Sequence, residues 1–249
     1  MKIILILIML FSVISIAAQE ANDNTENKDY NMQEPGTLSE HFSSQIAREF
    51  GTDKISIKFS ENGSAKEIYG DLNKSITATN QLEKCFQLFE LHRNLFGIAN
   101  PRQELKLYKT TRDWSNGTAS DIALIQVYND IKVIGGGYTI HFYKDGSIIG
   151  AHGSLYPSAS QVSTSPLIDE GQAGIIAIND PRAKNSTAED IMSAEIVIKE
   201  YQKVCRLAWK INILNPEDML GADFYVDSQT GEVIGVSNSL RIDDPNLSK

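Results

Sequence analysis

Short runs of alternating apolar and polar residues, joined by turn dipeptides, fill residues 104–157 and restrict the fold more than any other feature of the sequence. Residues 122–128 and 138–142 each have the two-residue period of a half-buried β-strand. Asn129-Asp130 and Asp145-Gly146 separate consecutive runs and are typical of tight turns. Strands joined by such short connections pair antiparallel, because a parallel crossover needs a helix between them. This stretch is therefore predicted to be an antiparallel meander.

A hairpin and a helix are predicted before the meander. Residues 55–59 and 65–72 read as two strands, and the chain then changes to a helical period. The apolar stripe of that helix consists of Leu82, Cys85, Phe86, Phe89 and Phe96. We expect Asn80 and Glu83 to form a capping pair at its start, and Gly97 to end it.

The pattern of a helix followed by antiparallel strands is repeated after a small, polar segment at 158–165, which we interpret as a linker. A helix is predicted over Asp169–Asn179, with Asp169 and Gln172 as its capping residues. Strands are predicted at 196–198, 207–213, 224–227 and 232–242. The sequence thus predicts an α+β fold of two domains, each with a helix packed on an antiparallel β-sheet.

The N-terminal residues 1–18 have the form of a cleavable export signal. Lys2 precedes an apolar run from Ile3 to Phe11, and small residues lead to an expected cut after Ala18. No membrane anchor is expected, because polar residues follow before the roughly 20 apolar residues that a spanning helix needs. Residues 19–36 are polar and are expected to be a disordered leader. The mature protein is predicted to be extracellular or periplasmic.

Charge and cysteine content restrict the partners and the covalent chemistry. Lys and Arg number 23 against 32 Asp and Glu, a formal net charge of −9, so no nucleic acid partner is expected. Cys85 and Cys205 are compatible with two buried thiols or with one bridge between the predicted domains. The oligomeric state is left open.

No catalytic constellation is found in the sequence. The four histidines are His41, His92, His141 and His152, and none of them starts the His-Glu-x-x-His pattern of a zinc protease. No Gly-x-Ser-x-Gly nucleophile motif occurs either. His141 and His152 are expected to face each other across the meander as a strand-pair contact. We therefore predict no enzyme activity, no metal site and no cofactor.

Two groups of motifs resemble known families. Tyr128-Asn-Asp-Ile-Lys-Val-Ile-Gly-Gly-Gly137, Lys144-Asp-Gly146 and Gly153-Ser-Leu-Tyr-Pro157 resemble the fungalysin/thermolysin propeptide domain. Arg206-Leu-Ala-Trp-Lys-Ile211 and Phe224-Tyr-Val-Asp-Ser-Gln-Thr-Gly-Glu-Val-Ile234 resemble the central strand and the hairpin of a PepSY domain. The two resemblances follow each other in the order found in pro-regions of thermolysin-like metalloproteases.

The residue patterns and the resemblance together give the expected domain boundaries and motif positions. The expected segments are a signal peptide at 1–18, a leader at 19–36, a propeptide-like domain at 37–157, a linker at 158–165, a PepSY domain at 166–242 and a tail at 243–249. The motif positions expected to be structural are Gly135, Gly136, Tyr156, Pro157, Trp209, Asp227, Thr230 and Gly231.

The resemblance also implies a function. The chain is expected to be a secreted, stand-alone propeptide-like protein that binds a thermolysin-like zinc protease, inhibits it or assists its folding. Leu240, Arg241 and Ile242 are the residues expected to reach that partner. Two alternatives are a decayed pro-region that lacks its catalytic domain, and a secreted PepSY adaptor for a ligand other than a protease.

Overall fold

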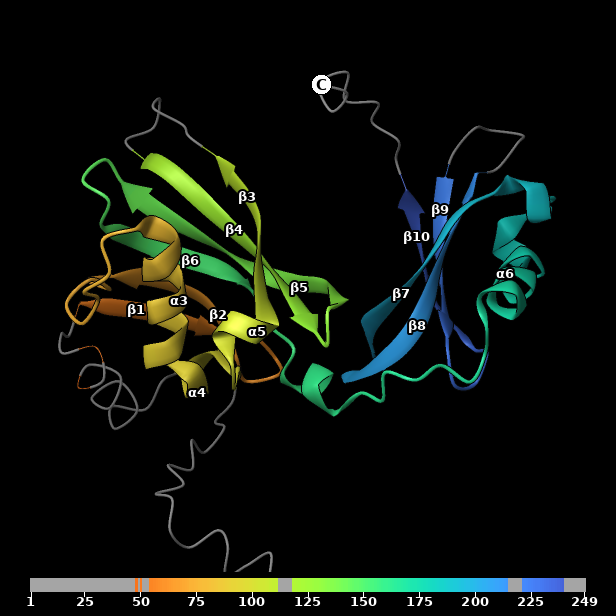
Figure 1. Ribbon diagram of the computed structural model, residues 1–249, viewed down its shortest axis with the longest axis horizontal. Helices are drawn as coiled ribbons and strands as arrows, with labels where there is room; N and C mark the ends of the chain where they lie inside the picture. The colour runs from red at the N-terminus through yellow and green to blue at the C-terminus, as the bar shows by residue number, and fades with distance from the viewer. Residues whose placement is uncertain (1–47, 49, 51–53, 112–117, 215–220, 240–249) are drawn as a thin grey trace, which may run out of the picture. The chain divides into compact units, whose positions relative to one another are not determined.

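The alternating segments of the sequence form β-strands, and the segments of helical period lie between them (Figure 1). A computed structural model describes residues 48, 50, 54–111, 118–214 and 221–239, all within one compact unit that spans 43–249. The strands are β1 (Ile55–Phe59), β2 (Ala65–Gly70), β3 (Leu105–Thr111), β4 (Thr118–Tyr128), β5 (Ile131–Tyr143), β6 (Ile148–Ser154), β7 (Ile191–Tyr201), β8 (Val204–Leu214), β9 (Gly221–Asp227) and β10 (Val233–Ser239). The α-helices are α3 (Gln81–Leu91), α4 (Arg93–Phe96), α5 (Pro101–Glu104) and α6 (Glu170–Ile178). The protein is α+β, as the sequence predicts.

Six antiparallel strands form the first part of the sheet, in the order β1-β2-β6-β5-β4-β3. One face packs against α3 and α4, because Phe89 and Phe96 both contact the Tyr138 ring, with centroids 5.4 and 5.3 Å apart. Both phenylalanines are fully buried. Burial of each such side chain contributes roughly 2–3 kcal/mol to folding. The predicted apolar stripe is therefore the contact between helix and sheet.

The predicted single helix is interrupted at His92. This residue has φ −123° and ψ 37°, outside the helical region, and separates α3 from α4. Its ring is buried and stacked on Phe50, with centroids 3.8 Å apart. Gly97 ends α4 with φ 63°, as the sequence predicts. The prediction of one continuous helix was wrong, because the backbone of His92, whose ring is buried against Phe50, lies outside the helical region.

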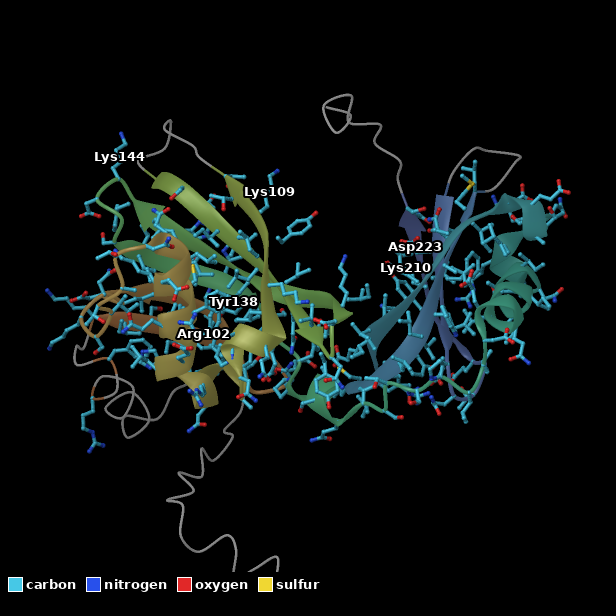
Figure 2. All side chains as sticks on the ribbon, viewed as in Figure 1. Arg102, Lys109, Tyr138, Lys144, Lys210 and Asp223 are labelled. Atoms are coloured by element: carbon cyan, nitrogen blue, oxygen red, sulfur yellow. The ribbon has the colours of Figure 1, made fainter. Side chains whose placement is uncertain are left out.

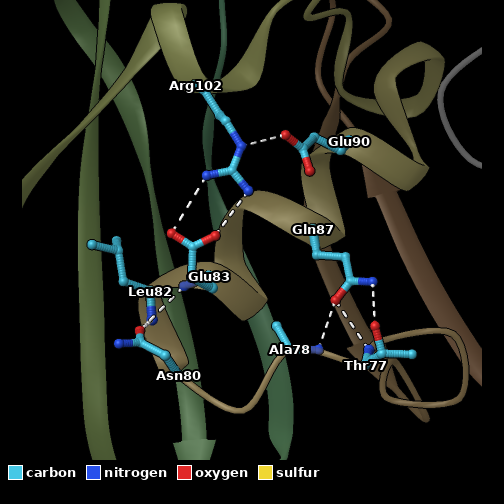
Figure 3. Close-up of polar contacts among 8 residues, drawn as sticks. All are labelled: Thr77, Ala78, Asn80, Leu82, Glu83, Gln87, Glu90 and Arg102. Carbon is cyan, nitrogen blue, oxygen red and sulfur yellow. Dashed lines mark hydrogen bonds and ion pairs between the residues drawn. The ribbon is translucent and has the colours of Figure 1, made fainter.

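The capping prediction for α3 holds for Asn80 and fails for Glu83. Asn80 Oδ1 accepts from the backbone N–H groups of Leu82 and Glu83, at 2.8 and 3.3 Å (Figure 3). The Glu83 carboxylate instead pairs with the Arg102 guanidinium at 2.8 Å, and Arg102 Nε also donates to Glu90 at 2.7 Å. A charge-assisted bond to a distant residue thus replaces the predicted local one.

Strand β5 runs through the glycine segment that precedes Tyr138. Its second half pairs with β4 and β6, and Val133 in its first half pairs parallel with Ile198 of β7. A Cβ on Gly137 would come 2.5 Å from the carbonyl oxygen of Leu124. Glycine is therefore required here by the close approach of two backbones, next to the irregular β4–β5 register between Ile125 and Val127.

The remaining strands pair antiparallel in the order β7-β8-β9-β10, and α6 packs on one face of them. The buried core under α6 comprises Ala173, Ala177, Ala183, Ile211, Ile213, Phe224 and Val226. Asp169 Oδ1 accepts from Gln172 N at 2.8 Å, and Gln172 Oε1 accepts from Asp169 N at 3.1 Å. This reciprocal pair is the capping box that the sequence predicts.

The segment predicted to be a linker overlaps a 3-10 helix at Pro157–Gln161. Ala159 is buried there in a cluster with Val133, Ile198 and Leu207. The boundaries of the two predicted domains stay a prediction.

Both cysteines are buried free thiols. Burial raises the pKa of Cys85 to about 12 and raises the pKa of Cys205 above its ordinary value. Because the thiolate is the reactive form, we expect a water-soluble aromatic disulfide reagent to leave the native protein unmodified. Both thiols should react after unfolding in guanidinium chloride. Rapid release of one chromophore equivalent from the native protein would contradict this expectation.

Candidate partner-binding face

The face of the first six strands that is turned away from α3 carries a continuous set of polar side chains. The strand register places Lys109, Ala123, Thr139, His152, Glu67 and Lys58 in one row across the six strands. A neighbouring row contains Thr111, Asp121, His141, Gly150 and Tyr69. We call these two rows the open face. Side chains alternate along each strand, so the buried residues between these positions point toward the helices.

A groove of about 600 Å³ lies on this face. Gly135, Gly136, Gly137 and Gly153 line it, together with side chains that include His152. Of these glycines Gly135 is exposed, Gly137 and Gly153 are half-buried and Gly136 is buried.

A hydrogen-bonded chain of three side chains crosses the open face. Asp121 Oδ1 lies 2.7 Å from His141 Nδ1, and His141 Nε2 lies 2.9 Å from His152 Nδ1. The two imidazole rings are stacked, with centroids 4.9 Å apart. Gly150 lies directly opposite His141 in the register, and the Tyr69 ring lies against it, because a Cβ there would overlap Tyr69 Cδ1. The predicted strand-pair contact between the histidines is therefore present.

The Asp121 carboxylate determines which atom donates in each of these two hydrogen bonds. An ionised carboxylate only accepts, so His141 Nδ1 donates to Asp121. In neutral His141 the other nitrogen, Nε2, accepts, and His152 Nδ1 must donate to it. His152 Nε2, on the far side of its ring, is then an acceptor. These two hydrogen bonds thus determine the tautomer of both histidines.

Neighbouring groups shift the protonation of this face. Partial burial lowers the pKa of His152, and the charge of His141 lowers it further, while Glu67 and Asp121 act in the opposite direction. A hydrogen bond from Lys58 Nζ, at 2.8 Å, lowers the pKa of Glu67. Because both pKa values are lowered, Glu67 is ionised and His152 is neutral at neutral pH.

We expect the NMR titration of His152 to have a midpoint below the ordinary histidine value of about 6.5 in the native protein. A lowered folded-state pKa means that the unfolded chain binds more protons. The contribution of His152 to stability is then complete above about pH 6.5 and is lost as the pH falls toward the folded-state pKa. His152→Gln assigns the resonance, and the same titration in urea supplies the reference. A native midpoint equal to the urea value would contradict the expected direction.

The hairpin between β9 and β10 is organised by Asp227, whose side chain is 4% exposed. Its Oδ1 accepts from the backbone N–H groups of Gln229 and Thr230, at 2.8 and 3.1 Å. Its Oδ2 accepts from Arg206 at 3.1 Å. Gly231 follows with φ 76°, in the left-handed region. These contacts define the geometry of the turn.

The other motif residues lie apart from the open face or at its margin. Trp209 is half-buried, and its Nε1 donates to the Ile168 carbonyl at 2.8 Å, just before α6. The backbone of Tyr156 forms two hydrogen bonds with the Gln126 amide, at 2.8 and 3.1 Å. Pro157 lies against the Gly97 backbone, because a Cβ there would come 2.5 Å from Pro157 Cγ.

The predicted partner contacts Leu240, Arg241 and Ile242 lie outside the described residues. Asp121 and Glu67 were not recognised in the sequence as members of a site. The signal for Asp121 was available, because the strand alternation continues from residue 122 to residue 121, but only the register places it opposite His141. Within the described ranges, no cluster of three or more His, Cys, Asp or Glu side chains could hold a metal ion.

Comparisons with known proteins agree with part of this description. Residues 103–155 match the Fungalysin/Thermolysin Propeptide Motif. The matched segment contains β3 to β6 and includes Asp121, His141 and His152. The chain therefore carries a propeptide motif, and the open face lies largely within it.

Two individual proteins are similar to parts of the chain. Bacillolysin of Brevibacillus brevis is 28% identical over 125 residues, which cover 47% of this chain and only 24% of that protein. The solved structure of the Bacillus megaterium YpeB C-terminal domain has a TM-score of 0.36 and 14% identity, covering 82% of this chain and 98% of that one. Among the described helices, none combines the length and apolar character needed to cross a bilayer.

Proposed function

We propose that this protein binds a thermolysin-like zinc protease in the manner of a pro-region and regulates it without catalysing a reaction. The match of residues 103–155 to a propeptide motif carries the proposal. The similarity to bacillolysin over 125 residues supports the same class of partner. Export, inferred from the N-terminal residues, would place the protein in the same compartment as a secreted protease.

The proposed mechanism is differential binding. A partner that binds the native protease but not its unfolded chain stabilises the native state by mass action, and so assists refolding. The same complex inhibits when it covers the substrate cleft. We propose that the open face provides the docking surface and that Leu240, Arg241 and Ile242 extend along the cleft as an added strand.

The test is an inhibition and refolding assay with residues 19–249 and Brevibacillus brevis bacillolysin. We expect the folded chain to slow peptide hydrolysis and to raise the yield of active bacillolysin recovered from guanidinium chloride. The heat-unfolded chain and a zinc protease of an unrelated family serve as controls. Unchanged hydrolysis together with an unchanged refolding yield, with the added chain still intact on a gel, would refute the proposal.

A further inference from the structure

We propose that the open face docks an extended acidic segment of the partner, whose carboxylates pair with Lys109 and His152, and that binding takes up one proton. This inference rests on the proposed function for the identity of the partner. The docking surface itself can be tested without any protease.

The charges of the open face favour an acidic ligand. The two carboxylates already have cationic or N–H partners on the sheet, since Glu67 pairs with Lys58 and Asp121 accepts from His141. Lys109 is exposed, and no carboxylate among the described residues forms an ion pair with it. The face thus offers unpaired positive charge in a chain whose formal net charge is −9. A cation without a carboxylate partner favours a ligand of the opposite charge.

The row across the sheet sets the direction of the ligand. Lys109 on β3 and His152 on β6 belong to the same row, with Ala123 and Thr139 between them. Adjacent strands are about 4.8 Å apart, so the two positions are separated by roughly 14 Å. Alternate residues of an extended chain lie about 6.6 Å apart, so carboxylates four residues apart can reach both. The groove lies at the His152 end of this row, where Thr139 and His152 line it.

The histidine pair couples this binding to one proton. At neutral pH His152 Nε2 is an acceptor, and a carboxylate, which is also an acceptor, cannot pair with it. When one proton is added at His152 Nε2, this nitrogen becomes an N–H donor and the hydrogen bonds to His141 and Asp121 are kept. A second proton would place two N–H groups against each other across 2.9 Å. The pair therefore accepts one proton with the ligand.

The other charged groups around His141 and His152 affect the uptake of this proton. The charged and titratable side chains that face it from the packed strands are Lys58 on β1, Lys66, Glu67 and Tyr69 on β2, Lys109 on β3 and Asp121 on β4. Glu67 and Asp121 stabilise the added proton, because both act to raise the pKa of His152. Binding is thus expected to strengthen as the pH falls.

The probe is a blocked, fluorescein-labelled peptide of alternating Glu and Ala, and its control replaces each Glu by Gln. We expect the full chain from residue 19 to bind the acidic peptide about threefold more tightly at about pH 5.5 than at about pH 7.5 in fluorescence anisotropy at low salt. His152→Gln should remove this pH dependence. Lys109→Gln should weaken binding at both pH values, whereas Lys144→Gln, at the β5–β6 turn, should not (Figure 2).

Three results would overturn the inference: equal binding of the Gln peptide, pH-independent binding by the native chain, or equal losses for Lys109→Gln and Lys144→Gln. Circular dichroism of each variant verifies that it is folded. The affinity of the unsubstituted protein for the acidic peptide can be compared at the two pH values without any variant. Binding of the acidic peptide without binding of bacillolysin would support this inference and refute the proposed function. Binding of bacillolysin without binding of the acidic peptide would support the proposed function and refute this inference.

Discussion

Asp227→Ala is expected to lower the free energy of unfolding by about 3 kcal/mol, measured by urea denaturation. The substitution removes three hydrogen bonds, two from backbone N–H groups of the turn and one from Arg206. The turn N–H groups lose their acceptor in a partly buried setting, which costs more than the loss of an exposed contact. The hairpin between β9 and β10 is the part of the fold that should respond.

Asp145→Ala is the matched control for this prediction. Asp145 also accepts from a residue two positions later in a hairpin turn, Ser147, at 2.8 Å for the backbone N–H. Asp145 is exposed and forms no ion pair with an arginine of the described residues. We expect a clearly smaller loss of stability. Equal losses of unfolding free energy for Asp227→Ala and Asp145→Ala would contradict the stabilising effect that we assign to burial and to Arg206.

Gly153→Ala is expected to cost about 3 kcal/mol or more, or to prevent folding. A Cβ at this position would overlap the carbonyl oxygen of Gly137 and come 2.7 Å from the Cα of Tyr138. Both are backbone atoms of β5, so no side-chain rotation can relieve the clash. The thermal unfolding midpoint of the purified variant gives the measurement, and the yield of soluble protein gives a second one.

Gly171→Ala provides the comparison for the glycine prediction. Gly171 lies in α6, and a Cβ there would meet only Asp169 Oδ1, at the ordinary contact distance of 3.5 Å. Because alanine favours the helix over glycine, this variant should be stabilised by up to about 1 kcal/mol. A destabilised Gly171→Ala together with an unaffected Gly153→Ala would show that the packing of β5 against β6 is described wrongly.

Local patterns in the sequence predict many elements of this fold. The strand alternation around Ile122 and Ile140, the box formed by Asp169 and Gln172, and the helix end at Gly97 depend on neighbouring residues only. Each of these signals acts within a few residues, where periodicity and capping rules apply directly.

The features that sequence reasoning missed depend on distant contacts. The ring of His92, where the helix breaks, is stacked on Phe50, and Glu83 pairs with Arg102 instead of capping the helix. The continuation of β5 through Gly137 depends on the approach of Leu124 from the neighbouring strand. None of these contacts has a local signature, because each joins residues that are separated along the chain.

Only part of the candidate site could be predicted from the sequence, because the rest also depends on contacts between distant residues. His141 and His152 were expected to meet because they belong to consecutive strands of a hairpin. Asp121 joins them through the β4–β5 pairing, whose register shifts between Ile125 and Val127, and Glu67 joins them through the pairing of β2 with the distant β6. A one-residue change of register moves a side chain to the other face, so the site needs the structure.

The most direct test of the account is the binding of residues 19–249 to intact Brevibacillus brevis bacillolysin, measured by isothermal titration calorimetry. We expect saturable one-to-one binding with a dissociation constant of about 1 μM or less, and no binding with the heat-unfolded chain. Mass spectrometry before and after the titration checks that the chain is not digested. An intact, folded chain that produces no binding heat by calorimetry at two temperatures, and no complex in size-exclusion chromatography at about 100 μM, would contradict it.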